Sequence, residues 1–436
     1  MFTYNLHLAV NSILKTRYMS LLMVIAIGLG IGLSMTILTV YKMMAADPIP
    51  QKSAALHVVR LDAWNPLEAF REPNVAPFQL TYQDAMALRK SDIPSIQAAM
   101  FRTGFVAQPE KDDLLPITLG ARATDRGFFT LFNVPFLFGD IWGATIDQNP
   151  AQVIVLSKAT NDKLFGGENS IGRTLQLDEY LFKVVGVLDE WAPPMKYYDI
   201  SNGPYNEAEE AYIPFSLTPS LELPAWGNTN GWKGETIESY ADRMASEYIW
   251  IQYWAQLDSP DQVAEYQAFI DSYAMEQKKL GRFERPLNNQ LTPLMAWLEE
   301  REVVGSETRV LLALAFMFLA VCLLNVVGLI LAKFSGKSAE ISIRRALGAD
   351  KATLFIQHLI ESAVIGSLGG LLGLGMAMLG LVGIASLAPD ISTMTTADYS
   401  LVIYTLLLSI TCTLLAGLYP TWRVCQIQPA SYLKTQ

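Results

Sequence analysis

The sequence predicts an α-helical membrane protein with four transmembrane helices in a 1+3 arrangement, together with a large α+β extracytoplasmic domain. Four apolar runs each approach or exceed the roughly 20 residues of helix that cross a bilayer. Between the first and second runs, residues 43–307 carry 37 acidic and 21 basic residues. The loop between the second and third runs, residues 333–359, is basic instead. Because loops rich in Lys and Arg stay in the cytoplasm, we expect the acidic segment to lie outside.

The composition narrows the function classes. The 436 residues are 51% hydrophobic with a net charge of −10, and the mean hydropathy is +0.25. This is apolar for a soluble protein and polar for one made only of membrane spans. The acidic outer segment would repel nucleic acid, so we expect no such partner. Cys322, Cys412 and Cys425 lie in or just after apolar runs, which leaves no disulfide framework for the outer segment.

The N-terminal residues predict a surface helix followed by the first span. Residues 1–17 contain no acidic side chain, and their apolar residues recur at helical spacing, as in a helix lying on a membrane surface. The run 18–42 is longer than the apolar core of a cleaved signal peptide, so we expect an uncleaved transmembrane helix. Gly28 and Gly32 form a pair of small residues suited to close helix packing.

The segment 43–307 predicts alternating strands and helices. Residues 152–156 read as a strand, Ser157 as the cap of a helix ending near 165, and 174–177 with 180–188 as a hairpin. Further predictions, made from the same signals, are a strand at 211–217, a helix at 260–280 capped by Ser259, and a continuous helix at 291–308 that leads into the second span.

Tryptophans gather in the loop-rich residues 191–255. Trp226 and Trp232 allow two interpretations, a surface for a partner or substrate, since aromatic residues are enriched there, or packing beneath long loops. Trp250 and Trp254 lie in a strand-like segment with alternating side chains, so we expect them in the core of the domain.

The remaining boundaries follow the apolar runs and loop charges. The prediction is a second span at 308–332, a cytoplasmic loop at 333–359, a third span at 360–388, an outer loop at 389–400, a fourth span at 401–420 that ends at Pro420, and a cytoplasmic tail at 421–436. Glu361 begins the third span. A carboxylate in a span is a candidate functional group, but we expect it at the interface, paired with a base such as Lys351 or Arg345.

The spacing of apolar residues in the basic loop predicts a short amphipathic helix. Ala339, Ile343, Ala346 and Leu347 form one apolar stripe. Glu340 and Arg344 stand four residues apart in the orientation that favours an ion pair. Gly348 then permits a sharp helix end. Such a helix lies either against a protein at the cytoplasmic face or on lipid headgroups.

Residues 340–349, EISIRRALGA, resemble the E-I-x-I-R-R-A-L-G-A signature of the MacB/FtsX superfamily of ABC-transporter permeases. In that family this stretch is the coupling helix seated on the ATPase. The resemblance therefore implies an ATPase-coupling role for Glu340, Ile341, Ile343, Arg344, Arg345, Leu347, Gly348 and Ala349. Residues 153–190 separately resemble the MacB-like periplasmic core domain, and the tail resembles the family's closing motif, P-x-x-R-x-x-x-x-x-P-x-x-x-L.

The resemblance implies a stand-alone permease subunit without a fused ATPase. Residues 167–174, GENSIGRT, almost spell a P-loop, but Arg173 stands where Lys is needed. A helix is also predicted before this segment and a strand after it, the reverse of a P-loop. His7, His57 and His358 are scattered, so no metal site is expected. We expect no enzyme activity and no cofactor in this chain, with ATP and Mg²⁺ bound by a partner ATPase.

The implied function is mechanotransmission in the inner membrane, with both termini cytoplasmic. ATP-driven motion of an ATPase dimer would be relayed to the outer domain, to export a peptide, small molecule or other substrate from the periplasm or outer leaflet. The implied partners are a second or related permease, a periplasmic adaptor, an outer-membrane channel and lipid. Two alternatives are release of lipoproteins, as by LolC/LolE permeases, and signalling without transport, as by FtsX; the large outer domain argues against the latter.

Overall fold

The computed structural model describes residues 2–108, 115–193, 195–206, 208–387 and 399–426. The chain forms two compact units, Met1–Ala46 with Val304–Gln436, and Asp47–Val303, which we call the helical unit and the outer unit. That the chain leaves the membrane at residue 43 and re-enters it after residue 307 stays a prediction. The loop predicted at 389–400 lies almost wholly, and the tail from 427 wholly, outside the described residues.

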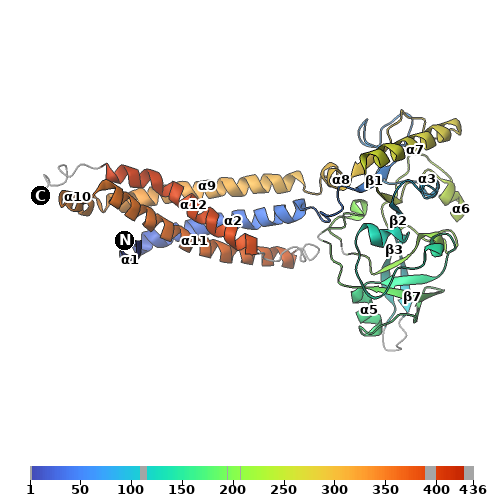
Figure 1. Cartoon of the computed structure of the whole chain (residues 1–436), viewed down its shortest axis with the longest axis horizontal. Helices are drawn as coiled ribbons and strands as arrows, with labels where there is room; N and C mark the ends of the chain where they lie inside the picture. The colour runs from blue at the N-terminus through green and yellow to red at the C-terminus, as the bar shows by residue number, and fades with distance from the viewer. Residues whose placement is uncertain (1, 109–114, 194, 207, 388–398, 427–436) are drawn as a thin grey trace. The chain divides into compact units, whose positions relative to one another are not determined.

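In the described part of the helical unit, four helices are long and apolar enough to cross a membrane. These are α2 (Arg17–Ala45), α9 (Ser306–Ser335), α11 (Lys351–Leu387) and α12 (Tyr399–Cys425). Helix α2 packs on α9 and α11, and α12 packs on α11, so the four run side by side (Figure 1). Two short helices, α1 (Phe2–Lys15) and α10 (Ser338–Ala346), complete the unit.

Helices α2 and α11 approach closely at the predicted glycine pair. A Cβ atom at Gly28 would lie 2.8 Å from Leu372, and one at Gly32 would lie 2.7 Å from Met376. Larger residues at either position would therefore force the helices apart. Every fourth residue of α2 from Met23 to Met35 is buried in the hydrophobic core that α2 shares with α9 and α11. Such packing by small residues is typical of helices in membranes.

The outer unit is built on one mixed sheet. Its ten described strands pair in the order β10-β1-β9-β2-β3-β8-β5-β7-β4, with β6 bonded to β2 and β7. The strands are β1 (Leu56–Arg60), β2 (Ile96–Gln108), β3 (Ile117–Thr124), β4 (Phe136–Gly139), β5 (Val153–Leu156), β6 (Thr174–Leu177), β7 (Tyr180–Leu188), β8 (Ala211–Pro214), β9 (Gln252–Gln256) and β10 (Gln290–Pro293). The helices are α3 (Tyr82–Leu88), α4 (Gly127–Leu131), α5 (Lys158–Phe165), α6 (Tyr240–Ala245), α7 (Pro260–Lys279) and α8 (Leu294–Glu300), with short 3-10 turns η1 (Ala144–Asp147), η2 (Ile200–Asn202) and η3 (Phe215–Leu217).

Local signals predicted several of these elements. Ser157 caps α5 by accepting a hydrogen bond from the Thr160 N–H, and Gly166 ends that helix in the left-handed conformation. Ser259 caps α7 in the same way. Strands β6 and β7 pair antiparallel around the predicted two-residue turn. The α+β prediction for this segment is therefore confirmed.

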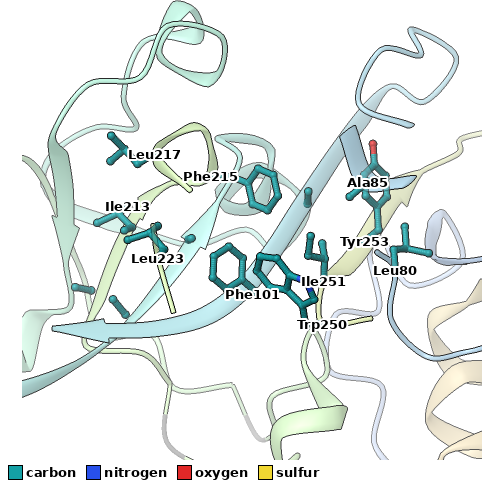
Figure 2. Packing of buried hydrophobic residues seen from close by; sticks show 14 of the residues in the cluster. Leu80, Ala85, Phe101, Ile213, Phe215, Leu217, Leu223, Trp250, Ile251 and Tyr253 are labelled. Atoms are coloured by element: carbon teal, nitrogen blue, oxygen red, sulfur yellow. The ribbon is translucent and has the colours of Figure 1, made fainter. Parts of the chain in front are cut away.

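The core of the outer unit lies between the sheet and the helices α3 and α7. Figure 2 shows its aromatic centre, where the Trp250 ring meets Phe101 edge-on at 4.6 Å between centroids. Trp250 and Trp254 are each 1% exposed, so the prediction that they belong to the core is confirmed. The Trp254 indole also donates a hydrogen bond to the Tyr198 carbonyl, 3.0 Å away.

A buried charge network holds part of the loop-rich segment 191–255. Arg122 on β3 contacts Asp199 and Glu209, each at 2.5 Å. Lys196 also contacts Glu209, at 2.6 Å. Burial alone would raise the pKa of Glu209, but Arg122 and Lys196 lower it below its usual range. The loops that supply these groups are thus tied to the central sheet by paired charges.

Two boundary predictions were wrong. Residues 291–308 are not one helix, because β10 pairs with β1 and the helical conformation ends at Glu300 and resumes at Ser306. Residues 211–217 form a strand only as far as Pro214, after which the chain tightens into η3. Helix α12 continues through Pro420 to Cys425, and the end of the fourth span at Pro420 stays a prediction about the membrane.

Asp125, which directly follows β3, is expected to make the stability of the chain depend on pH. It pairs with Arg89 at 2.6 Å and accepts a hydrogen bond from the Ala99 N–H. Burial raises its pKa to about 6 despite Arg89. The folded chain thus binds this proton more tightly than the unfolded chain, and stability is lost as the pH rises from about 4 to about 6. Lowering the pH from about 7.5 to about 5 should stabilise wild type by about 1 kcal/mol more than Asp125→Asn.

Urea unfolding of the full chain in detergent, followed by tryptophan fluorescence, measures this difference. Equal pH dependence in the two proteins would contradict it.

Candidate functional site

Helix α10, the predicted coupling helix, lies between the ends of α9 and α11. It starts at Ser338, and its chain reverses at Gly348, which has a φ of +97°. The Ala349 N–H donates to the Arg344 carbonyl and the Gly348 N–H to that of Arg345. This conformation is the left-handed one that glycine adopts without strain, as the sequence predicted.

One face of α10 packs on the helical unit. Ser338, Ile341 and Ser342 are buried there, and Ile341 joins the hydrophobic core formed by the spans. Ala349 packs against the same core from the following turn. Of the residues predicted to couple to an ATPase, Ile341 and Ala349 thus fix the position of the helix rather than offering a surface.

The opposite face of α10 exposes the predicted apolar stripe. Ile343 is 54% exposed and Leu347 83% exposed, and Ala339 and Ala346 are exposed beside them. We call these four residues the apolar stripe of α10. Large exposed apolar side chains among charged neighbours mark a contact surface.

Charged residues border this stripe. Arg344 and Glu340 form the predicted ion pair, 2.6 Å apart, and both are partly exposed. Arg345 points the other way, and its guanidinium donates to the Cys425 carbonyl at the end of α12, 3.4 Å away. Glu340 and Arg344 are therefore available at the surface, whereas Arg345 also ties α10 to α12.

Beneath α10 lies a buried ion-pair network that the sequence did not reveal. Lys333 of α9 contacts the Glu361 carboxylate of α11 at 2.7 Å. Lys337 lies 3.6 Å from the same carboxylate oxygen, and His358 lies 3.5 Å from the other. The Ser12 hydroxyl of α1 donates to Glu361 and accepts from Lys337. The network thus joins α1, α9 and α11 at the base of α10.

Glu361 pairs with basic residues, as predicted, but the two residues named as examples were wrong. Glu361 pairs with Lys333 and Lys337, not with Lys351 or Arg345. The side chains of Glu361 and Lys333 are 2% and 0% exposed, so Glu361 is buried between helices; its place at the membrane interface stays a prediction. The signal that could have found the pair is Lys333 itself, a cation at the end of an apolar span.

The two tryptophans considered as a partner surface, Trp226 and Trp232, differ in exposure. Trp226 is 42% exposed and lies across β2, where a Cβ atom at Gly104 would clash with its ring at 2.0 Å. Trp232 is half-buried and donates a hydrogen bond to the Ala63 carbonyl, 3.1 Å away. A partner surface at these residues stays a prediction, and Trp226 is the more accessible of the two.

Residues 167–174, which resemble a P-loop, lie between a helix and a strand in the order that was predicted. They follow α5 and lead into β6, and the Arg173 guanidinium lies 4.5 Å from the centroid of the Phe165 ring. A phosphate-binding P-loop runs from a strand into a helix instead. Within the part of the chain that the structure describes, no group of three or more His, Cys, Asp or Glu is placed to hold a metal ion.

Two family models match the chain. The MacB-like periplasmic core domain matches residues 20–273, and the FtsX-like permease C-terminal domain matches residues 312–429, which include α10. Because the first covers more than half of the chain, the protein belongs to the MacB/FtsX-like family of ABC-transporter permeases.

Individual relatives are distant. The pyoverdine export ATP-binding/permease protein PvdT of Pseudomonas entomophila (strain L48) is 27% identical over 61% of this chain and 35% of PvdT. The uncharacterized ABC transporter permease YvrN of Bacillus subtilis (strain 168) is 23% identical over 71% of this chain and 68% of YvrN. The chain thus spans about a third of PvdT and two thirds of YvrN.

A solved structure also aligns with the chain. It is the periplasmic region of MacB from Actinobacillus actinomycetemcomitans, with 14% identity and a TM-score of 0.37 over 60% of this chain and 98% of that one. The family assignment rests on the two family models, not on this alignment.

Proposed function

We propose that the chain is the permease subunit of a MacB-like ABC transporter whose ATPase is a separate dimeric subunit. The four apolar helices would cross the inner membrane in a 1+3 arrangement, with the outer unit in the periplasm and both termini in the cytoplasm. A second permease copy or a related permease would complete the transporter. ATP and Mg²⁺ would bind in the partner, and this chain would carry no catalytic group.

The observation that carries this proposal is the exposed apolar stripe of α10. Ile343 and Leu347 face outward beside the Glu340–Arg344 pair, while Ile341 anchors the opposite face in the helical unit. A helix held rigidly on one side and apolar on the other suits a docking surface for a protein. We propose that Glu340, Ile343, Arg344 and Leu347 contact the ATPase and that Ile341, Arg345, Gly348 and Ala349 hold the helix in place.

The proposed mechanism is mechanical. Movement of the ATPase dimer would displace α10, and the Lys333–Glu361 pair would carry that displacement into α9 and α11. Buried ion pairs resist separation, because either charge alone is costly away from water. The outer unit would then act on substrate in the periplasm. Export is favoured because one relative, PvdT, is named as an exporter of pyoverdine. The proposed substrate is a peptide, small molecule or other substrate.

Purification of the tagged full chain from its native membrane in mild detergent tests the proposal. We expect an ABC ATPase and a second permease chain to co-purify, together with a periplasmic adaptor if export is tripartite. Recovery of a lipoprotein or lipoprotein chaperone would favour lipoprotein release instead. A folded chain that brings down no ATPase would overturn the proposal.

A further inference from the structure

A cavity of about 90 Å³ lies between α1, α10 and α11, on the side of α10 away from its apolar stripe. Its polar lining includes Lys15, Lys337, Arg344 and Gln357. A single water needs about 10–15 Å³ on the same measure, so the cavity has room for several heavy atoms. A phosphate group is of this size.

Positive charge exceeds negative charge around this cavity. Glu361 is shared between the ammonium groups of Lys333 and Lys337, at 2.7 and 3.6 Å. The Lys337 side chain is only 20% exposed, so water compensates little of its charge. Glu340, the carboxylate that lines the cavity among the described residues, is paired with Arg344 at 2.6 Å.

Lys15 adds a further cation from the last turn of α1. In the described part of the chain, three cations line the cavity, Lys15, Lys337 and Arg344, against one carboxylate, that of Glu340. The cost of such an excess is greatest at Lys337, which is largely buried, and an anion in the cavity would lower it. Asn11 and Gln357 also line the cavity, and their amide groups can donate hydrogen bonds to anionic oxygens.

Helix α1 indicates where this anion comes from. Its outward face carries Leu6, Val10 and Leu14, which are 37%, 41% and 66% exposed. Lys15, which lines the cavity, follows directly after Leu14, so apolar and cationic side chains adjoin on α1. A lipid supplies both matching parts, acyl chains for the apolar face and a charged headgroup for the cations. A free inorganic anion supplies only the second.

We propose that this cavity binds the phosphate of an anionic phospholipid headgroup from the surrounding leaflet, with Lys15, Lys337 and Arg344 as its cationic ligands. Basic pockets between transmembrane helices are a recognised type of headgroup site. The bound lipid bridges α1 and α10 and so fixes the helix that carries the apolar stripe. The proposal needs no ATPase, and because Arg344 also belongs to the docking surface proposed above, the variants below leave it unchanged.

Titration of the full chain, delipidated in detergent, with phosphatidylglycerol or phosphatidylcholine tests this, using native mass spectrometry to count bound lipid. Wild type should bind phosphatidylglycerol in preference to phosphatidylcholine. Each lost cation should weaken binding about fivefold, the worth of one basic residue near an anionic surface. We therefore expect about a fivefold loss for Lys15→Gln and about a 25-fold loss for Lys15→Gln with Lys337→Gln.

The matched control is Arg17→Gln with Lys351→Gln, which removes two cations from the same unit but none from the cavity lining. It should bind phosphatidylglycerol like wild type. Lys15 is exposed, so Lys15→Gln tests the site without disturbing the fold. Equal losses in the control and cavity variants, or equal binding of the two lipids, would overturn the proposal. Full displacement of phosphatidylglycerol by millimolar inorganic phosphate would also overturn it, as a site for a free anion.

Discussion

Replacing Ile343 and Leu347 together by aspartate is expected to weaken binding of the ATPase subunit at least about a hundredfold. Each side chain would otherwise bury apolar surface worth at least about 1.5 kcal/mol in the complex, and every 1.4 kcal/mol is about tenfold in affinity. Both side chains already face outward in the free chain, so the substitutions should leave the fold intact. Binding of the purified ATPase to immobilised full chain gives the affinity directly.

A matched control places the same substitutions elsewhere. Leu67→Asp with Leu280→Asp changes two leucines of the outer unit that are 92% and 74% exposed. This control should bind the ATPase like wild type. If the α10 variant also binds like wild type while remaining monodisperse, the apolar stripe is not the docking surface.

Glu361→Gln is expected to destabilise the helical unit by roughly 3–5 kcal/mol, because it leaves Lys333 and Lys337 buried without their carboxylate. Replacing the pair together, as Lys333→Met with Glu361→Gln, should recover much of this loss, since a buried pair contributes little net stability over apolar residues. The buried thiol of Cys322 on α9 reports unfolding of this unit through its reaction with a thiol-specific dye on heating.

The exposed pair supplies the control for Glu361. Glu340 and Arg344 are 56% and 38% exposed, so Glu340→Gln should change stability by less than about 1 kcal/mol. Equal midpoints for Glu361→Gln and Glu340→Gln would show that the buried network contributes nothing specific. A double variant as unstable as Glu361→Gln would contradict the account of Lys333 as its partner.

Local signals in the sequence predicted much of α10. The Glu340–Arg344 pair, the helix end at Gly348 and the apolar stripe all follow from residues within one or two helical turns of each other. The resemblance to the family identified the helix, but it did not say which of its residues face outward. That division depends on the packing of Ile341 and Ser342 against the spans, which only the folded chain specifies.

Contacts between segments that are distant in the chain could not be predicted from local sequence patterns. Nothing in the local pattern couples Ser12 or Lys333 to Glu361, because these residues meet only when α1, α9 and α11 assemble. The prediction of a continuous helix at 291–308 was wrong for the same reason, a contact with a distant segment. Its first residues have no strong local preference, and they become β10 because the edge of β1 offers them a hydrogen-bonding partner.

The central claim is that the outward face of α10 contacts an ATPase, and site-specific photo-crosslinking in living cells tests it most directly. A photoreactive amino acid at position 347 should capture an ABC ATPase, whereas the same group at position 342, which is buried against the spans, should not. Capture of lipid alone at position 347, in cells where the chain is stable and active, would contradict the claim and make α10 a membrane-surface helix.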